Sequence, residues 1–61
     1  MRDPNRIDDF LKELGKIWKE RVPNWRFGQL ISNLQSSMKR DIFFMEEDEF
    51  LKVVKEYLNI I

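Results

Sequence analysis

The sequence predicts a small all-α domain of three helices with short connections. Apolar residues recur at spacings of three and four along most of the chain, which is the period of an amphipathic helix. The 61 residues include only two glycines and two prolines, so few positions interrupt a helix. A chain of this length forms a single domain, and residues 1–61 are therefore interpreted as one three-helix unit.

The first helix is predicted over residues 4–21. Asp3 followed by Pro4 is typical of a helix start, since the Asp carboxylate accepts from free N–H groups and proline fits the first helical position. Pro23 ends the helix. Gly15 lies at the edge of the apolar stripe, where we expect another helix to approach its backbone closely. The stripe consists of Ile7, Phe10, Leu11, Leu14, Ile17, Trp18 and Val22.

The second helix is predicted over residues 25–38, with Asn24 as its N-cap. Residues 27–38 carry no charge in a chain in which 36% of the residues are charged. Because a helix face in contact with solvent normally carries charges, we expect this helix to be covered on more than one side. Its apolar stripe consists of Phe27, Leu30, Ile31, Leu34 and Met38.

The third helix is predicted over residues 46–60. It begins with an acidic run at residues 46–49, which suits the positive end of the helix dipole. Its apolar arc is wide and continues to Ile60 and Ile61. The preceding apolar run at residues 42–45 is either a strand-like connector or an early part of this helix, because four residues are too few for periodicity to decide.

The composition argues against most catalytic and metal-binding classes. Without cysteine or histidine, the chain forms no disulfide framework, no zinc site of the Cys/His kind, and no thiolate or imidazole catalyst. The acidic run lacks the glycine of a calcium loop, and consecutive helical residues point in different directions. A three-helix domain also leaves little room for the partly dry pocket that an acid–base pair needs. We therefore expect no enzyme activity, no metal and no cofactor.

The charges balance overall but not along the chain. Eleven Lys and Arg residues match eleven Asp and Glu residues, yet basic residues gather in residues 16–40 and acidic ones in residues 41–61. This separation either gives the surface a dipole that orients a partner or complements the dipoles of the helix ends. No apolar run approaches the roughly 20 residues of a membrane span, and the first residues lack the apolar region of a signal peptide. We expect a cytoplasmic protein that does not enter membranes.

A nucleic-acid-binding domain is disfavoured by the zero net charge. The second helix has no Lys or Arg between Phe27 and Met38, and the third begins with acids that phosphate would repel. The alternative that remains open is a nucleic-acid-associated regulator that contacts phosphate through basic loop residues. Those residues are Arg21, Arg26, Lys39 and Arg40.

The aromatic content is the strongest positive signal for function. Two Trp, one Tyr and five Phe residues are more than one small core easily encloses. We expect those on the predicted stripes to be buried, namely Phe10, Trp18, Phe27 and Phe50. Trp25, Phe43 and Phe44 fall in connectors beside Arg26 and Arg40, and aromatic residues with arginine are typical of interface hot spots. The alternative is that these rings close the ends of the helix bundle.

The segment from Arg26 to Asn33 reads Arg-Phe-Gly-Gln-Leu-Ile-Ser-Asn and follows an amphipathic helix. It resembles the R-x-G-Q-L-I-x-N segment of a group of short uncharacterised helical proteins from bacteria and their phages. The resemblance extends to the acidic closing helix, although the acidic run here is slightly shifted in register. That group has no assigned activity. The resemblance implies that Arg26, Gly28, Gln29 and Asn33 act together.

The leading hypothesis is a small helical protein-interaction module, homodimeric, that acts as an inhibitor or adaptor by binding another protein. A phage or mobile-element origin follows from the size and the resemblance. The expected anchors are Trp25, Phe43 and Phe44. Arg26, Gln29 and Asn33 complete the expected partner-binding or dimer interface, with Gln29 and Asn33 one helical turn apart.

Overall fold

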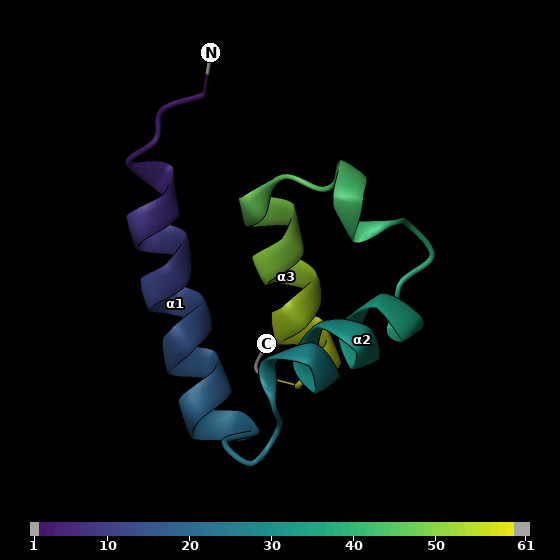
Figure 1. The fold of residues 1–61 in the computed structure, drawn as a ribbon. Helices are drawn as coiled ribbons and strands as arrows, with labels where there is room; N and C mark the ends of the chain where they lie inside the picture. The colour runs from purple at the N-terminus through teal and green to yellow at the C-terminus, as the bar shows by residue number, and fades with distance from the viewer. Residues whose placement is uncertain (1, 60–61) are drawn as a thin grey trace.

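The computed structural model describes residues 2–59. It contains α1 (Arg6–Arg21), α2 (Phe27–Ser37) and α3 (Glu47–Tyr57), with a short 3₁₀ turn, η1 (Ile42–Phe44), between α2 and α3. Helices α1 and α3 lie side by side, and α2 runs across them (Figure 1). The predicted all-α, three-helix fold is confirmed.

Helix α1 begins two residues later than predicted. The Asp3 side chain accepts from the Asn5 backbone N–H at 3.0 Å, and the Asp3 carbonyl accepts from the Arg6 N–H at 3.2 Å. Asp3 therefore organises a turn that leads into the helix, and it does not cap the first helical turn itself. The end of α1 at Arg21 agrees with the prediction. Pro23, which follows shortly after, has no N–H with which to continue it.

Helix α2 is shorter at both ends than predicted, and Asn24 is not its N-cap. Arg26 occupies the N-cap position, and its backbone N–H donates to the side-chain oxygen of Gln29 at 2.8 Å. A turn precedes it, in which the Trp25 N–H donates to the Val22 carbonyl at 3.1 Å. This turn uses the residues that the prediction assigned to the start of the helix.

Helix α3 begins with its acidic turn as predicted, but it ends at Tyr57 instead of residue 60. Asn59 follows with a φ of 62°, a left-handed conformation that asparagine adopts more readily than most residues and that does not continue a helix. Ile60 and Ile61, which the prediction placed at the end of this helix, lie outside the described residues. Residues 42–44, left open between strand and helix, form the 3₁₀ turn.

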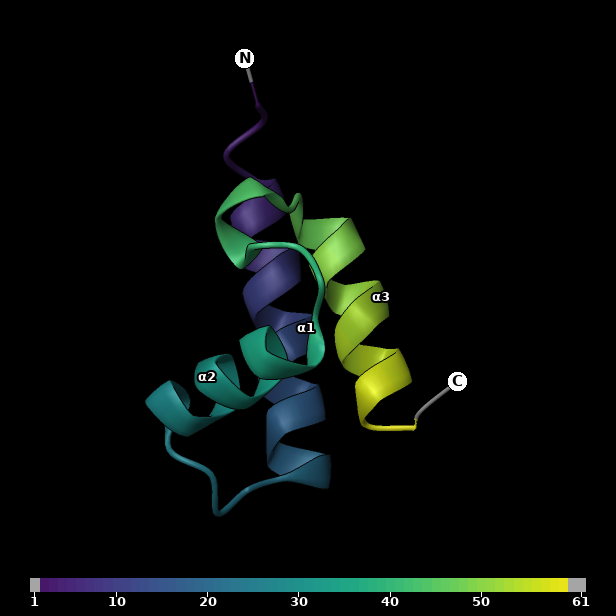
Figure 2. The same cartoon turned by 90° about the vertical axis from the view of Figure 1, so that its right-hand side faces the viewer.

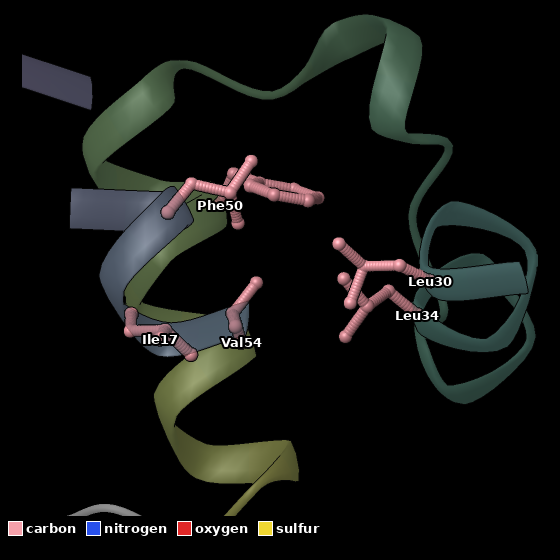
Figure 3. Packing of buried hydrophobic residues seen from close by; sticks show 6 residues of the cluster. Ile17, Leu30, Leu34, Phe50 and Val54 are labelled. Carbon is pink, nitrogen blue, oxygen red and sulfur yellow. The ribbon is translucent and has the colours of Figure 1, made fainter. Parts of the chain in front are cut away.

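Each helix contributes two side chains to the core. Leu30 and Leu34 of α2 point toward Phe50 and Val54 of α3, as Figure 3 shows. All six core side chains are at most 6% exposed, and they are Leu14, Ile17, Leu30, Leu34, Phe50 and Val54. A core this small leaves much apolar surface uncovered.

Two neighbouring aromatic residues differ in burial from the leading expectation, and Trp25 agrees with the alternative in which connector rings close the bundle. Trp25, expected as an exposed anchor in a connector, is half-buried and packs against the core, and its carbonyl accepts from Trp18 Nε1 at 2.9 Å. Phe27, expected in the core, is exposed over 58% of its surface, with its ring centroid 5.9 Å from that of Trp18. Phe27 lies one turn before Leu30, the first buried residue of α2, so the stripe extends further along the helix than the core does.

The expectation for Gly15 is wrong. No helix approaches it within the described chain, since a Cβ built there would meet no atom within 4 Å apart from its chain neighbours and its own helix backbone. Within one copy of the chain, α1 and α3 both lie on the same side of α2 (Figure 2), so the expected cover on another side of α2 stays a prediction. Its neutral outer residues are exposed, namely Gln29, Ser32, Asn33 and Ser36.

Candidate functional site

An open apolar groove of about 360 Å³ lies between α1, α2, η1 and the first turn of α3. Figure 2 shows η1 and α2 on the same face of α1. The exposed rim of the groove consists of Leu11, Phe27 and Phe43, which are 56%, 58% and 83% exposed. Its deeper lining includes Phe10, Leu14, Ile31, Ile42, Met45 and Phe50. We refer to this feature as the apolar groove.

The charged residue at the edge of the apolar groove is neutralised within the chain. Glu47 lines the groove, and one of its carboxylate oxygens lies 2.6 Å from Nε of Arg6. The surface that the groove offers to a partner is therefore apolar in character.

The turn that carries Phe43 is held by side chains on both sides of it. The Gln35 side-chain oxygen accepts from the Ile42 N–H at 2.8 Å, and its amide nitrogen donates to the Arg40 carbonyl at 2.9 Å. Asp41 accepts from the Phe43 N–H at 3.0 Å and so caps η1. These bonds hold η1 in one backbone position relative to α2.

Arg40 adds a second connection, between η1 and α3. Its guanidinium donates to the Phe44 carbonyl at 3.2 Å and forms an ion pair with Glu49. The Phe43 and Phe44 rings contact each other edge to face, with centroids 4.9 Å apart at 80°. Of the two rings, only Phe43 lines the apolar groove.

The predicted site residues are only partly brought together. Phe43 and Phe44 are exposed side by side, as expected for interface anchors. Trp25 is half-buried. Arg26 and Gln29 are joined through the α2 cap, which occupies the Gln29 side-chain oxygen, and Asn33 is exposed on the outer face of α2.

Sequence reasoning missed four residues that build the candidate site. Leu11, Phe27 and Ile31 belong to the predicted apolar stripes, of which only a part is buried. Gln35 was not singled out. The sequence feature that could have indicated it is a neutral glutamine near the border of the apolar stripe, because an amide at that position reaches the following connector.

The acidic start of α3 is matched by three arginines. Arg2 bonds Glu46 with contacts of 3.0 and 2.5 Å, Arg6 pairs with Glu47, and Arg40 pairs with Glu49. The hydrogen bond from Arg2 lowers the pKa of the Glu46 carboxyl below its ordinary value and raises the pKa of the Arg2 guanidinium. Glu46, Glu47 and Glu49 therefore each pair with an arginine, and residues 2–59 contain no group of three acidic side chains that could hold a metal ion.

Of the residues considered for phosphate binding, Arg40 is already engaged by Glu49 and by the Phe44 carbonyl. Arg21, Arg26 and Lys39 are exposed. Within the part of the chain that the structure describes, every helix is too short or too polar to cross a membrane.

Comparison of the chain with protein-family models, with curated proteins and with solved structures finds no match. The functional conclusion therefore rests on the apolar groove, on the bonds that hold η1, and on the distribution of charge over the helices.

Proposed function

We propose that this chain is a small protein-interaction module that binds a polypeptide through the apolar groove. The observation that carries the proposal is the exposed apolar rim formed by Leu11, Phe27 and Phe43. Contiguous exposed apolar patches on small soluble domains commonly mark interaction surfaces.

The way in which η1 is held supports the same function. Among the large apolar side chains of residues 2–59, Phe43 is the most exposed, yet the hydrogen bonds of Gln35 and Asp41 restrain its backbone. An aromatic anchor on a restrained backbone loses little conformational entropy when it binds, so more of its burial contributes to affinity. A phenylalanine that served only to stabilise the fold would contribute more if its ring were buried in the core.

The chemistry of the groove indicates what it binds. With Glu47 paired to Arg6, the groove offers apolar side chains and no free charge of its own. We therefore expect an occupant that presents apolar side chains and whose affinity comes from the burial of apolar surface. By occupying that surface the module acts as an inhibitor or an adaptor, and homodimerisation is part of the proposal.

Selection of displayed peptides on the folded chain tests this function. Peptides that bind the groove should lose about tenfold or more in affinity for Phe43→Ser and Leu11→Ser, as expected when a hot-spot contact is removed. Phe44→Ser is the matched control, because it removes the neighbouring ring from outside the groove. Circular dichroism of each variant establishes that the helices are retained. Failure to select any peptide, together with a monomeric mass at every concentration, would overturn the proposal.

A further inference from the structure

We infer that the occupant of the apolar groove is a second copy of this chain, docked about a two-fold axis that passes beside α2. This inference rests on the proposed function and names its partner. It is carried by the small size of the core and by the absence of charge on α2.

The exposed apolar surface of the groove favours a permanent cover. In residues 2–59, six large apolar side chains are more than a third exposed, among them Leu11, Phe27 and Phe43, while six apolar residues are buried in the core. The chain has no cysteine for a disulfide, and small domains without disulfides or metals commonly gain the missing burial by association. A second copy is present whenever the chain is present, whereas another protein would leave the groove open until it bound.

Helix α2 differs from the other two helices in carrying no charge. None of the eleven residues of α2 is charged, whereas both α1 and α3 carry acidic and basic residues on their outer faces. In a two-fold contact a residue near the axis meets its own copy, so any charge there would face a like charge. A different protein imposes no such condition, because it could supply the opposite charge. The neutral α2 therefore favours a second copy over an unrelated partner.

The groove and the neutral helix form one continuous surface. Phe27 and Ile31 of α2 line the groove, and Ser32 follows next on the exposed side of the same helix. With the two α2 helices antiparallel across the axis, Phe43 of each copy enters the other copy between Leu11 and Phe27. The burial is then reciprocal, as a two-fold interface requires.

Light scattering on a sizing column tests the inference over a hundredfold range of loading. The expected mass is about 15 kDa, twice the 7.5 kDa of the chain, falling toward 7.5 kDa only at the greatest dilution. Phe43→Ser should raise the dissociation constant of the dimer about tenfold or more, whereas the control Phe44→Ser should leave it nearly unchanged. A wild-type chain of 7.5 kDa at every loading would overturn this inference. The proposed function would then still stand or fall by the selected peptides.

A charge exchange at Ser32 tests the position of the axis. Ser32→Lys and Ser32→Glu should each weaken the homodimer through like-charge repulsion, while an equal mixture of the two should form a heterodimer, detected by native mass spectrometry. Ser32 is exposed, so neither substitution disturbs the core. Lys52→Glu, on an exposed position of α3, is the control and should leave the dimer intact. Random pairing makes the heterodimer equal in amount to the two homodimers taken together. That result would place the contact elsewhere and overturn the inference.

Discussion

The side-chain oxygen of Gln35 accepts a hydrogen bond from the Ile42 backbone N–H at 2.8 Å and thereby joins α2 to η1. The same amide donates to the Arg40 carbonyl, so one side chain serves two backbone groups of the connector. Because Phe43 follows Ile42 directly, these two bonds restrain the backbone that carries the most exposed side chain of the apolar groove.

We expect Gln35→Ala to lower the free energy of unfolding by about 1 kcal/mol, because the half-buried Ile42 N–H and the exposed Arg40 carbonyl lose their partner. The Ile42 amide should also exchange its hydrogen faster than in the wild type. Urea denaturation and hydrogen exchange measure the two effects. Asn33→Ala, an exposed substitution on the same helix, should change stability by no more than about 0.5 kcal/mol. Unchanged exchange at Ile42 would show that other contacts hold η1.

Gly15→Ala should stabilise the chain by about 1 kcal/mol, because Gly15 lies in the interior of α1 and the added Cβ meets no atom within 4 Å apart from its chain neighbours and its own helix backbone. Thermal unfolding checks this, with an increase in Tm of about 4–8 °C expected for a domain of this size. Gly15→Val serves as a comparison and should stabilise less, since a β-branched side chain has a lower helix propensity. A decrease in Tm for the alanine variant would indicate that something packs closely on Gly15 in solution.

Trp25→Ala should destabilise the fold by about 2–3 kcal/mol, because the half-buried ring packs against the core. Phe44→Ala is the matched truncation of an aromatic residue that is 68% exposed, and it should cost less than about 1 kcal/mol. Denaturant titrations of the two variants measure the difference. Equal losses in stability would contradict the assignment of Trp25 to the edge of the core.

The Arg2–Glu46 pair predicts a pH dependence with a definite sign. The bond from Arg2 favours the charged carboxylate in the folded chain and so lowers the pKa of Glu46. The Arg2–Glu46 pair therefore contributes fully to stability above the pKa of Glu46 in the unfolded chain, which is about 4.3. This contribution is lost as the pH falls through the lower pKa of Glu46 in the folded chain. NMR titration of the Glu46 carboxyl carbon measures this. Arg2→Gln should return the pKa toward its ordinary value, and a pKa that stays low in that variant would assign the shift to another group.

Much of the local structure could be predicted from the residues alone. Pro23 stops α1 near the expected position, the acidic run opens α3, and the stripe residues Leu30, Leu34 and Val54 are buried as their spacing indicates. These features depend on backbone chemistry and on which side of a helix is apolar, and both are written in short stretches of sequence. The exposure of Phe43 and Phe44 was also predicted from the local sequence, because both residues lie in a connector and not on the apolar stripe of a helix.

The three-dimensional packing decided the remainder. Spacing indicates which side of a helix faces inward, but it does not tell how far along that side the neighbouring helices extend. Phe27 lies on the apolar stripe of α2 but precedes the first buried residue of that helix, so it stays exposed. Trp25 packs against the core because the turn before α2 places it there. The apolar groove and the Gln35 bonds arise where α1, α2 and η1 meet. That meeting joins residues far apart in the chain, and no local pattern of the sequence specifies it.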